Sequence, residues 1–323
     1  MNEDQGFTEE KSSSRGFVLL SLITSAYATY PSVVLTSLLL LDIGLTFGCP
    51  LGVMTQIRTL SSIVAFVAAL LMSVMSVRFT HKSLLLAGLL CLSVSALGSG
   101  SAVNLNTMFM FYAITGLGTT MVEPNISTLV AEYFPLEKRS KVIGWVWCGG
   151  SLSYIIGSYV IGFIAGFGGW RLAFLGYAMI LPLAGFMLAS RGLPSLSHQS
   201  TMSRGNYGEA FKSVFLNRSA LACVIGNLLA SASALGISFY SFSFLRQRYL
   251  TPTGWVGVIG SATSICYFLG SFISGTLVDK FGRKTMIVSG IVMFSLFTFL
   301  YTTFPSFWLS VVVTMLGHLF LAL

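Results

Sequence analysis

The feature that most constrains this chain is a series of long apolar runs separated by short polar segments. A helix needs about 20 mostly apolar residues to cross a membrane, so each run predicts one spanning helix. Only 9% of the residues are charged, against about 25% in soluble domains, so lipid must be the main solvent of the folded chain. The sequence therefore predicts an all-α membrane protein with about ten spans: 17–41, 51–77, 83–103, 107–130, 141–167, 171–190, 219–245, 254–278, 285–303 and 307–323.

The basic residues between these runs predict how the helices are oriented. With the N-terminus placed in the cytoplasm, most of the 18 Lys and Arg residues fall on the cytoplasmic side, whereas Arg171, Arg246 and Arg248 fall in loops on the other side. The same basic loops suit anionic lipid head groups, so the net charge of +8 does not indicate nucleic acid. We expect a multi-pass protein of the cell membrane that has a cytoplasmic N-terminus and contacts membrane lipids.

The sequence lacks the patterns that hold metals, cofactors or catalytic groups. Its five cysteines show no metal-ligand spacing. We find no phosphate-binding Gly-rich loop, no zinc-binding His-Glu-x-x-His and no nucleophile elbow. We therefore expect neither a metal nor a cofactor, and not an enzyme.

The longest polar stretch divides the predicted spans into two groups. It covers 191–218 and reads as a cytoplasmic linker, which leaves a six-helix bundle at 1–190 and a second bundle of about four helices at 219–323. The chain stops inside an apolar run at Leu323, so we expect the second bundle to be truncated.

A charged loop occurs twice in the chain. The clearer copy is Gly275-Thr-Leu-Val-Asp279-Lys-Phe-Gly282-Arg283-Lys284, and a degraded copy at 73–82 has Val77 in place of the aspartate. Both copies lie between two apolar runs. A helical unit that is used twice in a membrane chain is typical of transporters.

Several motifs together resemble the major facilitator superfamily of secondary transporters. The loop at 275–284 resembles the signature that follows the second helix of each bundle in that family. The segments 116–139 and 149–174 resemble helix four with its exit loop and helix five with the turn into helix six. The resemblance implies a 6+6 helix bundle, here with its second half incomplete. It also implies a monomer that carries a small-molecule substrate by alternating access, with protons as candidate coupling ions.

Three departures from the family pattern weigh against drug/proton antiport. Val77 replaces the usual aspartate of the first loop, and Tyr112 stands where many members place an arginine. Ser158, in place of a proline, follows Gly157. These changes leave the predicted fold intact.

Two charged residues inside the runs are candidates for the transport pathway. Arg58 lies about eight residues, or ~12 Å, into the second run, and a charge at that depth must face protein or water. It is either a structural arginine paired with Asp42 or a cation that attracts an anionic substrate. Glu123 is the only carboxylate well inside a run and precedes Pro124. It is either a hydrogen-bonded group at a proline kink or the carrier of a coupling proton.

Other polar and aromatic side chains could line the same pathway. Thr119 shares a helical face with Glu123, and Tyr112 lies further along the same helix. Trp147 and Tyr154 lie on one face of 141–167, and Asn227 lies in 219–245. Such faces suit an amphipathic organic substrate, but they also suit ordinary helix packing. Tyr27 and Tyr30 precede Pro31 and could either gate the pathway or support a kink.

The repeated loop suggests a conformational latch. By the symmetry of the two bundles, Asp279 should face the start of helix five, where Arg139 and two lysines lie. Gly275, Gly282, Arg283 and Lys284 would shape that latch. The alternative is an ordinary loop with weak local ion pairs.

These observations predict secondary active transport of a small organic solute, with efflux as the first hypothesis and proton coupling as a candidate mechanism. Uptake of a small anionic metabolite through Arg58 is the second hypothesis. A membrane sensor or scaffold that has kept the fold but lost transport is the third.

Overall fold

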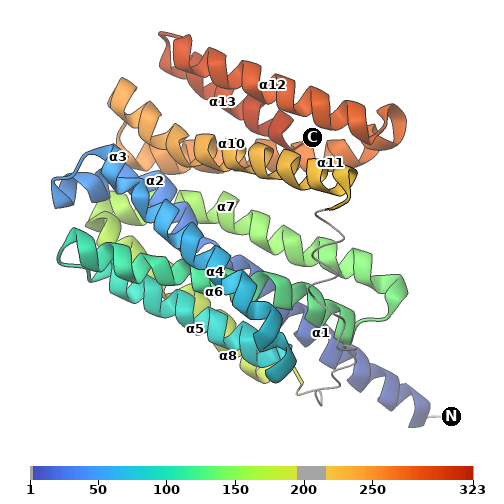
Figure 1. Cartoon of the computed structure of the whole chain (residues 1–323). Coiled ribbons are helices and arrows are strands. Elements are labelled where there is room, and N and C mark those ends of the chain that lie inside the picture. The colour runs from blue at the N-terminus through green and yellow to red at the C-terminus, as the bar shows by residue number, and fades with distance from the viewer. Residues whose placement is uncertain (1–2, 195–215, 323) are drawn as a thin grey trace. The chain divides into compact units, whose positions relative to one another are not determined.

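The structure is a computed structural model that describes residues 3–194 and 216–322. It leaves undescribed the side chains of 3–14, 73, 74, 77, 275, 276, 278, 279 and 283. Every regular element in the described ranges is a helix (Figure 1). The chain divides into two compact units. Unit 1 comprises 1–198 with 252–261, and unit 2 comprises 199–251 with 262–323. Most of the predicted linker at 191–218 lies outside the described residues.

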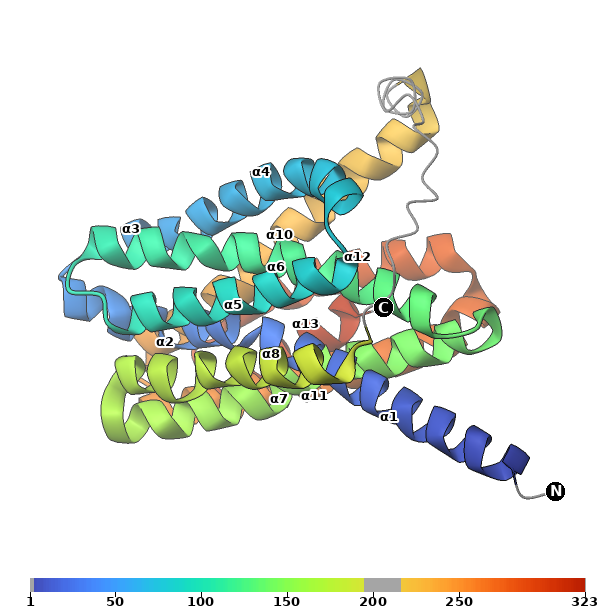
Figure 2. The same cartoon turned by 90° about the horizontal axis from the view of Figure 1, so that it is seen from below.

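Unit 1 consists of long helices that run side by side, as both views show (Figures 1 and 2). Proline and glycine residues set several of its breaks. Pro31 follows the end of the first helix, and Gly48 (φ 61°) and Gly169 (φ 73°) adopt left-handed turns that suit glycine. The elements are α1 (Glu3–Thr29), α2 (Pro31–Phe47), α3 (Leu51–Met54), α4 (Gln56–Arg78), α5 (His81–Gly100), α6 (Leu105–Tyr133), α7 (Leu136–Ala173), the π-helical turn η1 (Phe174–Ala178) and α8 (Ile180–Gly192).

Glycines allow the helices of unit 1 to pack closely. A Cβ atom added to Gly88 of α5 would lie 2.9 Å from the Cβ of Met121 and 3.0 Å from the carbonyl oxygen of Gly118, both on α6. A Cβ atom added to Gly149 of α7 would lie 2.7 Å from the carbonyl oxygen of Ile23 on α1. Small residues at such crossings are typical of membrane helices, because close backbone approach replaces the hydrophobic drive that lipid does not supply.

Unit 2 contains α10 (Arg218–Tyr249), the later part of α11 (Thr253–Phe281), α12 (Arg283–Thr303) and α13 (Phe307–Leu321). Aromatic and hydroxyl contacts join these helices. The rings of Phe297 and Phe320 stack with centroids 5.5 Å apart, and the Tyr249 hydroxyl donates to the carbonyl oxygen of Phe304 at 2.8 Å. The first part of α11 belongs to unit 1.

Seven helical stretches of the described chain are long and apolar enough to cross a membrane. One of them, Leu136–Gly192, contains two predicted runs, which meet at a kink where Gly169 has a non-helical conformation. The predicted run 107–130 is not among the seven; its helix, α6, carries Glu123, Asn125 and several threonines. The helix at 307–321 is apolar but shorter. The structure confirms an all-helical membrane protein but does not support the count of ten spans.

Candidate transport site

A carboxylate, a hydroxyl and a guanidinium come together inside unit 1. Glu123 lies partly buried on α6, and the Tyr30 side chain forms a hydrogen bond with its carboxylate. The positive charge of Arg58 on α4 also acts on this carboxylate. The structure therefore places the two charged residues that the sequence predicts within range of each other's charge, and it adds a tyrosine between α1 and α2. Both neighbours favour the charged form of the carboxylate, which offsets part of the cost of burying it.

Tyr30 reaches this position because the backbone breaks there. The helix α1 ends at Thr29, and Pro31 starts α2 with a nitrogen that cannot donate a hydrogen bond. The Tyr30 ring lies beside the Tyr154 ring of α7, with centroids 5.2 Å apart and planes inclined by 41°. A Cβ atom added to Gly150 would lie 3.0 Å from the Tyr30 Cε2 atom. Tyr30 thus connects the acid on α6 with the aromatic face of α7.

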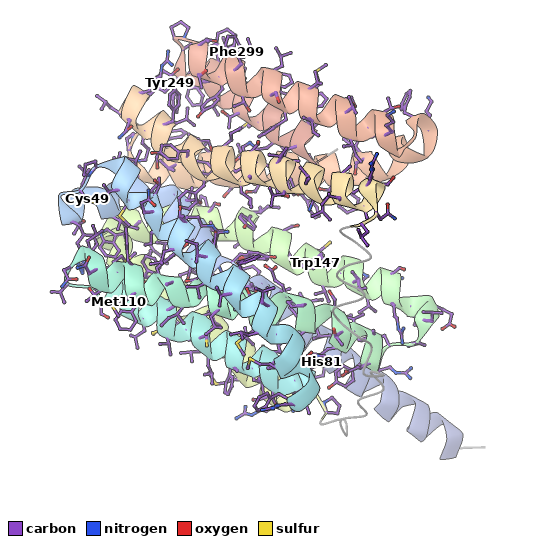
Figure 3. All side chains as sticks on the ribbon, viewed as in Figure 1. Cys49, His81, Met110, Trp147, Tyr249 and Phe299 are labelled. Carbon is purple, nitrogen blue, oxygen red and sulfur yellow. The ribbon has the colours of Figure 1, made fainter. Side chains whose placement is uncertain are left out.

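That aromatic face remains partly open. Trp147, Gly150 and Tyr154 recur at intervals of three and four residues, so they share one side of α7. The exposed fractions of Trp147 and Tyr154 are 41% and 36%. Trp147 lies in the first half of α7, where Figure 3 labels it. Exposed rings that are linked through Tyr30 to a partly buried charged group can receive the apolar part of a ligand whose charged end reaches the cluster.

The other predicted pathway residues lie in different settings. Thr119 donates to the carbonyl oxygen of Gly116 on its own helix at 3.1 Å. Tyr112 is fully buried, and within the described chain its hydroxyl has no hydrogen-bond partner. Asn227 is exposed on α10 in unit 2. None of these three is brought into the Glu123 cluster by a described contact.

The second loop copy shapes the start of α12. Gly275 and Asp279 lie in α11, and Gly282 caps α12 with φ 81°, which only glycine adopts readily. Lys284 is exposed in the first turn of α12. The side chains of Asp279 and Arg283 lie outside the described residues, so the latch stays a prediction.

Arg139, the predicted basic partner of the latch, has local contacts. Its Nε atom donates to the carbonyl oxygen of Phe134 at 3.0 Å, and a terminal nitrogen donates to that of Ala131 at 2.6 Å. These bonds satisfy carbonyl groups at the end of α6 and fix the corner between α6 and α7.

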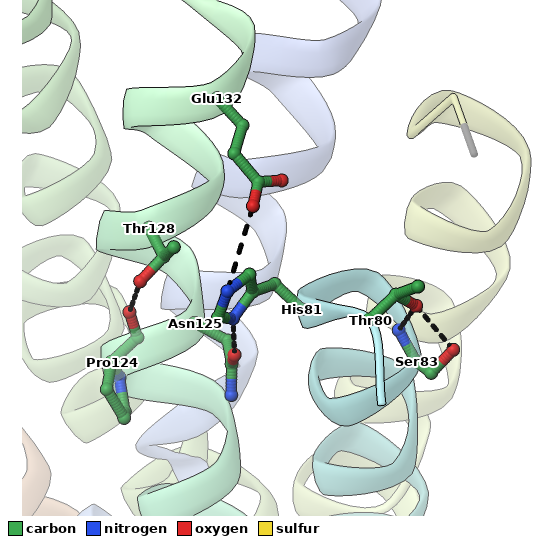
Figure 4. A network of polar contacts seen from close by, with 7 residues as sticks. All are labelled: Thr80, His81, Ser83, Pro124, Asn125, Thr128 and Glu132. Atoms are coloured by element: carbon green, nitrogen blue, oxygen red, sulfur yellow. Dashed lines mark hydrogen bonds and ion pairs between the residues drawn. The ribbon is translucent and has the colours of Figure 1, made fainter. Parts of the chain in front are cut away.

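The first loop copy ties together three helices of unit 1. His81 opens α5, and its Nδ1 atom lies 2.7 Å from the Asn125 Oδ1 atom on α6 (Figure 4). Its Nε2 atom lies 3.7 Å from Glu132, also on α6. The Lys82 ammonium donates to the carbonyl oxygen of Ser190 at 3.0 Å and to that of Leu193, at the end of α8. Sequence reasoning missed these contacts, because the partners lie 44 to 111 residues away in the chain.

The fold and this cluster define a multi-pass helical membrane protein with charged side chains within its first unit. The sequence profile of the Major Facilitator Superfamily matches residues 17–256, and that of the sugar (and other) transporters matches 224–320. The chain belongs to the Major Facilitator Superfamily. The resemblance noted from its motifs is thereby confirmed, and the family is one of transporters rather than enzymes.

Individual relatives are distant. Multidrug resistance protein 2 of Bacillus subtilis (strain 168) is 26% identical over 244 residues, which cover 73% of this chain and 60% of that protein. The cis,cis-muconate transport protein of Acinetobacter baylyi is 26% identical over 238 residues, which cover 68% of this chain and 55% of that protein. The chain thus spans little more than half the length of these relatives. The xylose transporter XylE from E. coli shares its fold, with a TM-score of 0.73 and 18% identity over 96% of this chain and 82% of XylE.

Proposed function

We propose that this protein is a secondary active transporter that moves a small organic solute across the membrane by alternating access. The observation that carries the proposal is the cluster of Arg58, Tyr30 and Glu123 within unit 1. Charged groups in membrane helices are costly, and those that face the interior of a bundle commonly mark the path of a substrate or proton. Membership of a transporter family supports the same conclusion.

We further propose that the substrate carries a carboxylate. Arg58 supplies a positive charge, and one relative is a transport protein for cis,cis-muconate, which is a dicarboxylate. We propose Glu123 as the proton carrier. A substrate anion that pairs with Arg58 would compete with the Glu123 carboxylate for the positive charge of the guanidinium. Efflux of drug-like solutes is the second candidate, favoured by the exposed rings of Trp147 and Tyr154 and by the multidrug resistance relative.

The placement of basic residues supports a cytoplasmic N-terminus in the cell membrane. One end of unit 1, where α4 meets α5 and α6 meets α7, carries Lys82, Arg139 and Arg191. The opposite end carries Arg171, which donates to the carbonyl oxygen of Ala102 at the turn between α5 and α6. This asymmetry follows the positive-inside rule. We also propose that the basic end contacts anionic lipids and that the protein is a monomer. We further propose that the chain divides into a bundle at 1–190, a linker at 191–218 and a second bundle at 219–323.

Counterflow in proteoliposomes tests the function. The purified protein should exchange radiolabelled organic acids but not cationic dyes across the bilayer. Arg58→Gln should reduce exchange of acids at least tenfold, because one charge contact is lost. Arg78→Gln, an exposed position at the end of the same helix, is the matched control and should keep wild-type exchange. Exchange of dyes alone would support the efflux hypothesis, and no exchange of any solute would support a sensor or scaffold.

A further inference from the structure

Tyr30 contacts residues from two other helices at the candidate site. Its hydroxyl bonds the Glu123 carboxylate on α6, and its ring lies beside Tyr154 and over Gly150 on α7. Its own backbone forms the break before Pro31. A residue that only supported this bend would need no polar contact with the acid. The hydroxyl contact instead joins the charged part of the site to its aromatic part.

The absence of a side chain at Gly150 makes this arrangement possible. A Cβ atom there would lie 3.0 Å from the Tyr30 ring, closer than carbon atoms normally approach, and 4.0 Å from the Trp147 ring. On this face of α7, the rings of Trp147 and Tyr154 lie on either side of a gap at Gly150. The Tyr30 ring lies against that gap. The result is an aromatic surface made from two separate segments of the chain, and the Tyr30 hydroxyl joins it to the Glu123 carboxylate, on which the charge of Arg58 acts.

We propose that Tyr30 is a specificity-determining residue, and that with Tyr154 and Trp147 it selects carboxylates that carry a flat conjugated or aromatic group. This inference rests on the proposed carboxylate transport. The carboxylate of such a ligand would pair with Arg58, while its flat part would lie against the rings. Aromatic pairs prefer offset or tilted contacts with centroids 4.5–7 Å apart, which a flat group satisfies and a puckered saturated ring does not.

Benzoate and cyclohexanecarboxylate form a suitable pair of probes. They have the same charge and the same number of carbon atoms, and they differ in whether the ring is flat. Equilibrium binding of each acid to the purified protein in detergent is measured by isothermal titration calorimetry, which avoids leakage of the acids through a bilayer. A single aromatic contact of ordinary strength corresponds to a roughly 2- to 12-fold gain in affinity, so we expect benzoate to bind about 3- to 10-fold more tightly.

Substitutions then test the role of Tyr30. Tyr30→Leu should bring the two affinities to within about twofold of each other by weakening benzoate binding, whereas Tyr30→Phe should keep the preference because it keeps the ring. Gly150→Ala should reduce the preference by displacing that ring. The control is Tyr159→Leu, which replaces an exposed tyrosine of α7 and should change the affinity for neither acid. Tyr154→Leu replaces Tyr30→Leu in the test if the latter does not fold.

The outcomes separate this inference from the proposed function. Equal affinity of the wild-type protein for the two acids would overturn the selection of flat groups and leave carboxylate transport standing. A preference that persists in Tyr30→Leu and Tyr154→Leu would also overturn the role of these rings. Failure to bind either acid, together with counterflow of another class of solute, would overturn both proposals.

Discussion

Replacement of Gly149 by alanine should destabilise unit 1, although the same change normally strengthens a helix. Alanine is favoured over glycine in a helix by about 1 kcal/mol. At Gly149, however, the added Cβ atom would lie 2.7 Å from the Ile23 carbonyl oxygen and 2.9 Å from the Ile23 Cγ2 atom. Ordinary contacts between carbon and a carbonyl oxygen begin near ~3.3 Å, so α1 and α7 would have to separate by about 0.6 Å. Because the carbonyl is part of a helix backbone, it cannot turn aside as a side chain could.

The expected magnitude follows from these two opposing effects. Overpacking of a well-packed contact costs about 1–3 kcal/mol, which exceeds the gain in helix propensity and leaves a net loss of up to about 2 kcal/mol. At Gly144 on the same helix, an added Cβ atom meets nothing within 4 Å, so Gly144→Ala should keep the full gain. The two variants should therefore differ in stability by about 1–3 kcal/mol. For a domain of this size that corresponds to a gap of roughly 2–12 °C between their melting temperatures.

Thermal unfolding of the purified protein in detergent, followed by circular dichroism, measures this gap. Both variants must be compared with the wild-type protein in the same detergent and at the same protein concentration. Gly149→Ala should melt below the wild-type protein and Gly144→Ala at or above it. If Gly149→Ala melts as high as Gly144→Ala, the close approach of α1 and α7 at Ile23 is wrong.

Three further predictions concern charge and buried hydrogen bonds. Glu123→Gln should abolish the dependence of uptake on a pH gradient in proteoliposomes, and uptake that still follows the gradient would exclude Glu123 as the proton carrier. Asp279→Lys should lower transport severalfold without changing the melting temperature, and unchanged transport would exclude the latch. Thr115→Val should cost about 1–3 kcal/mol, because the buried Ser95 hydroxyl loses its partner at 2.6 Å, and should lower the melting temperature. Adding Ser95→Ala should recover part of that loss, and no recovery would contradict the pairing.

The sequence was sufficient to predict the helical membrane fold, and it singled out two residues of the candidate site. Arg58 and Glu123 stood out because a charge inside an apolar run is costly wherever it lies. Tyr30 carried no such signal, because a tyrosine before a proline also suits a simple kink. Its proposed role depends on Gly150, which lies 120 residues later in the chain. One local sign was available: in Trp147-x-x-Gly150-x-x-x-Tyr154 a glycine interrupts an aromatic face and leaves room for a ring from another segment.

The number and the limits of the spans were harder to predict from the sequence than the presence of membrane helices. The polar groups of α6 lower its apolar character, although the helix packs against α5 through Gly88 and Gly118. Hydropathy records composition and cannot weigh such packing. Gly169 has a positive φ between two predicted runs, so the long stretch Leu136–Gly192 consists of two helices that meet at a kink.

The contacts of the first loop copy make it a fixed corner of unit 1. His81 is bonded to Asn125 on α6, and Lys82 binds carbonyl groups at the end of α8. Because α5 begins at His81, the start of this helix is tied to two neighbouring helices at once. A displacement of this corner would therefore be transmitted to α5, α6 and α8 together, so these three helix ends should move as one rigid part.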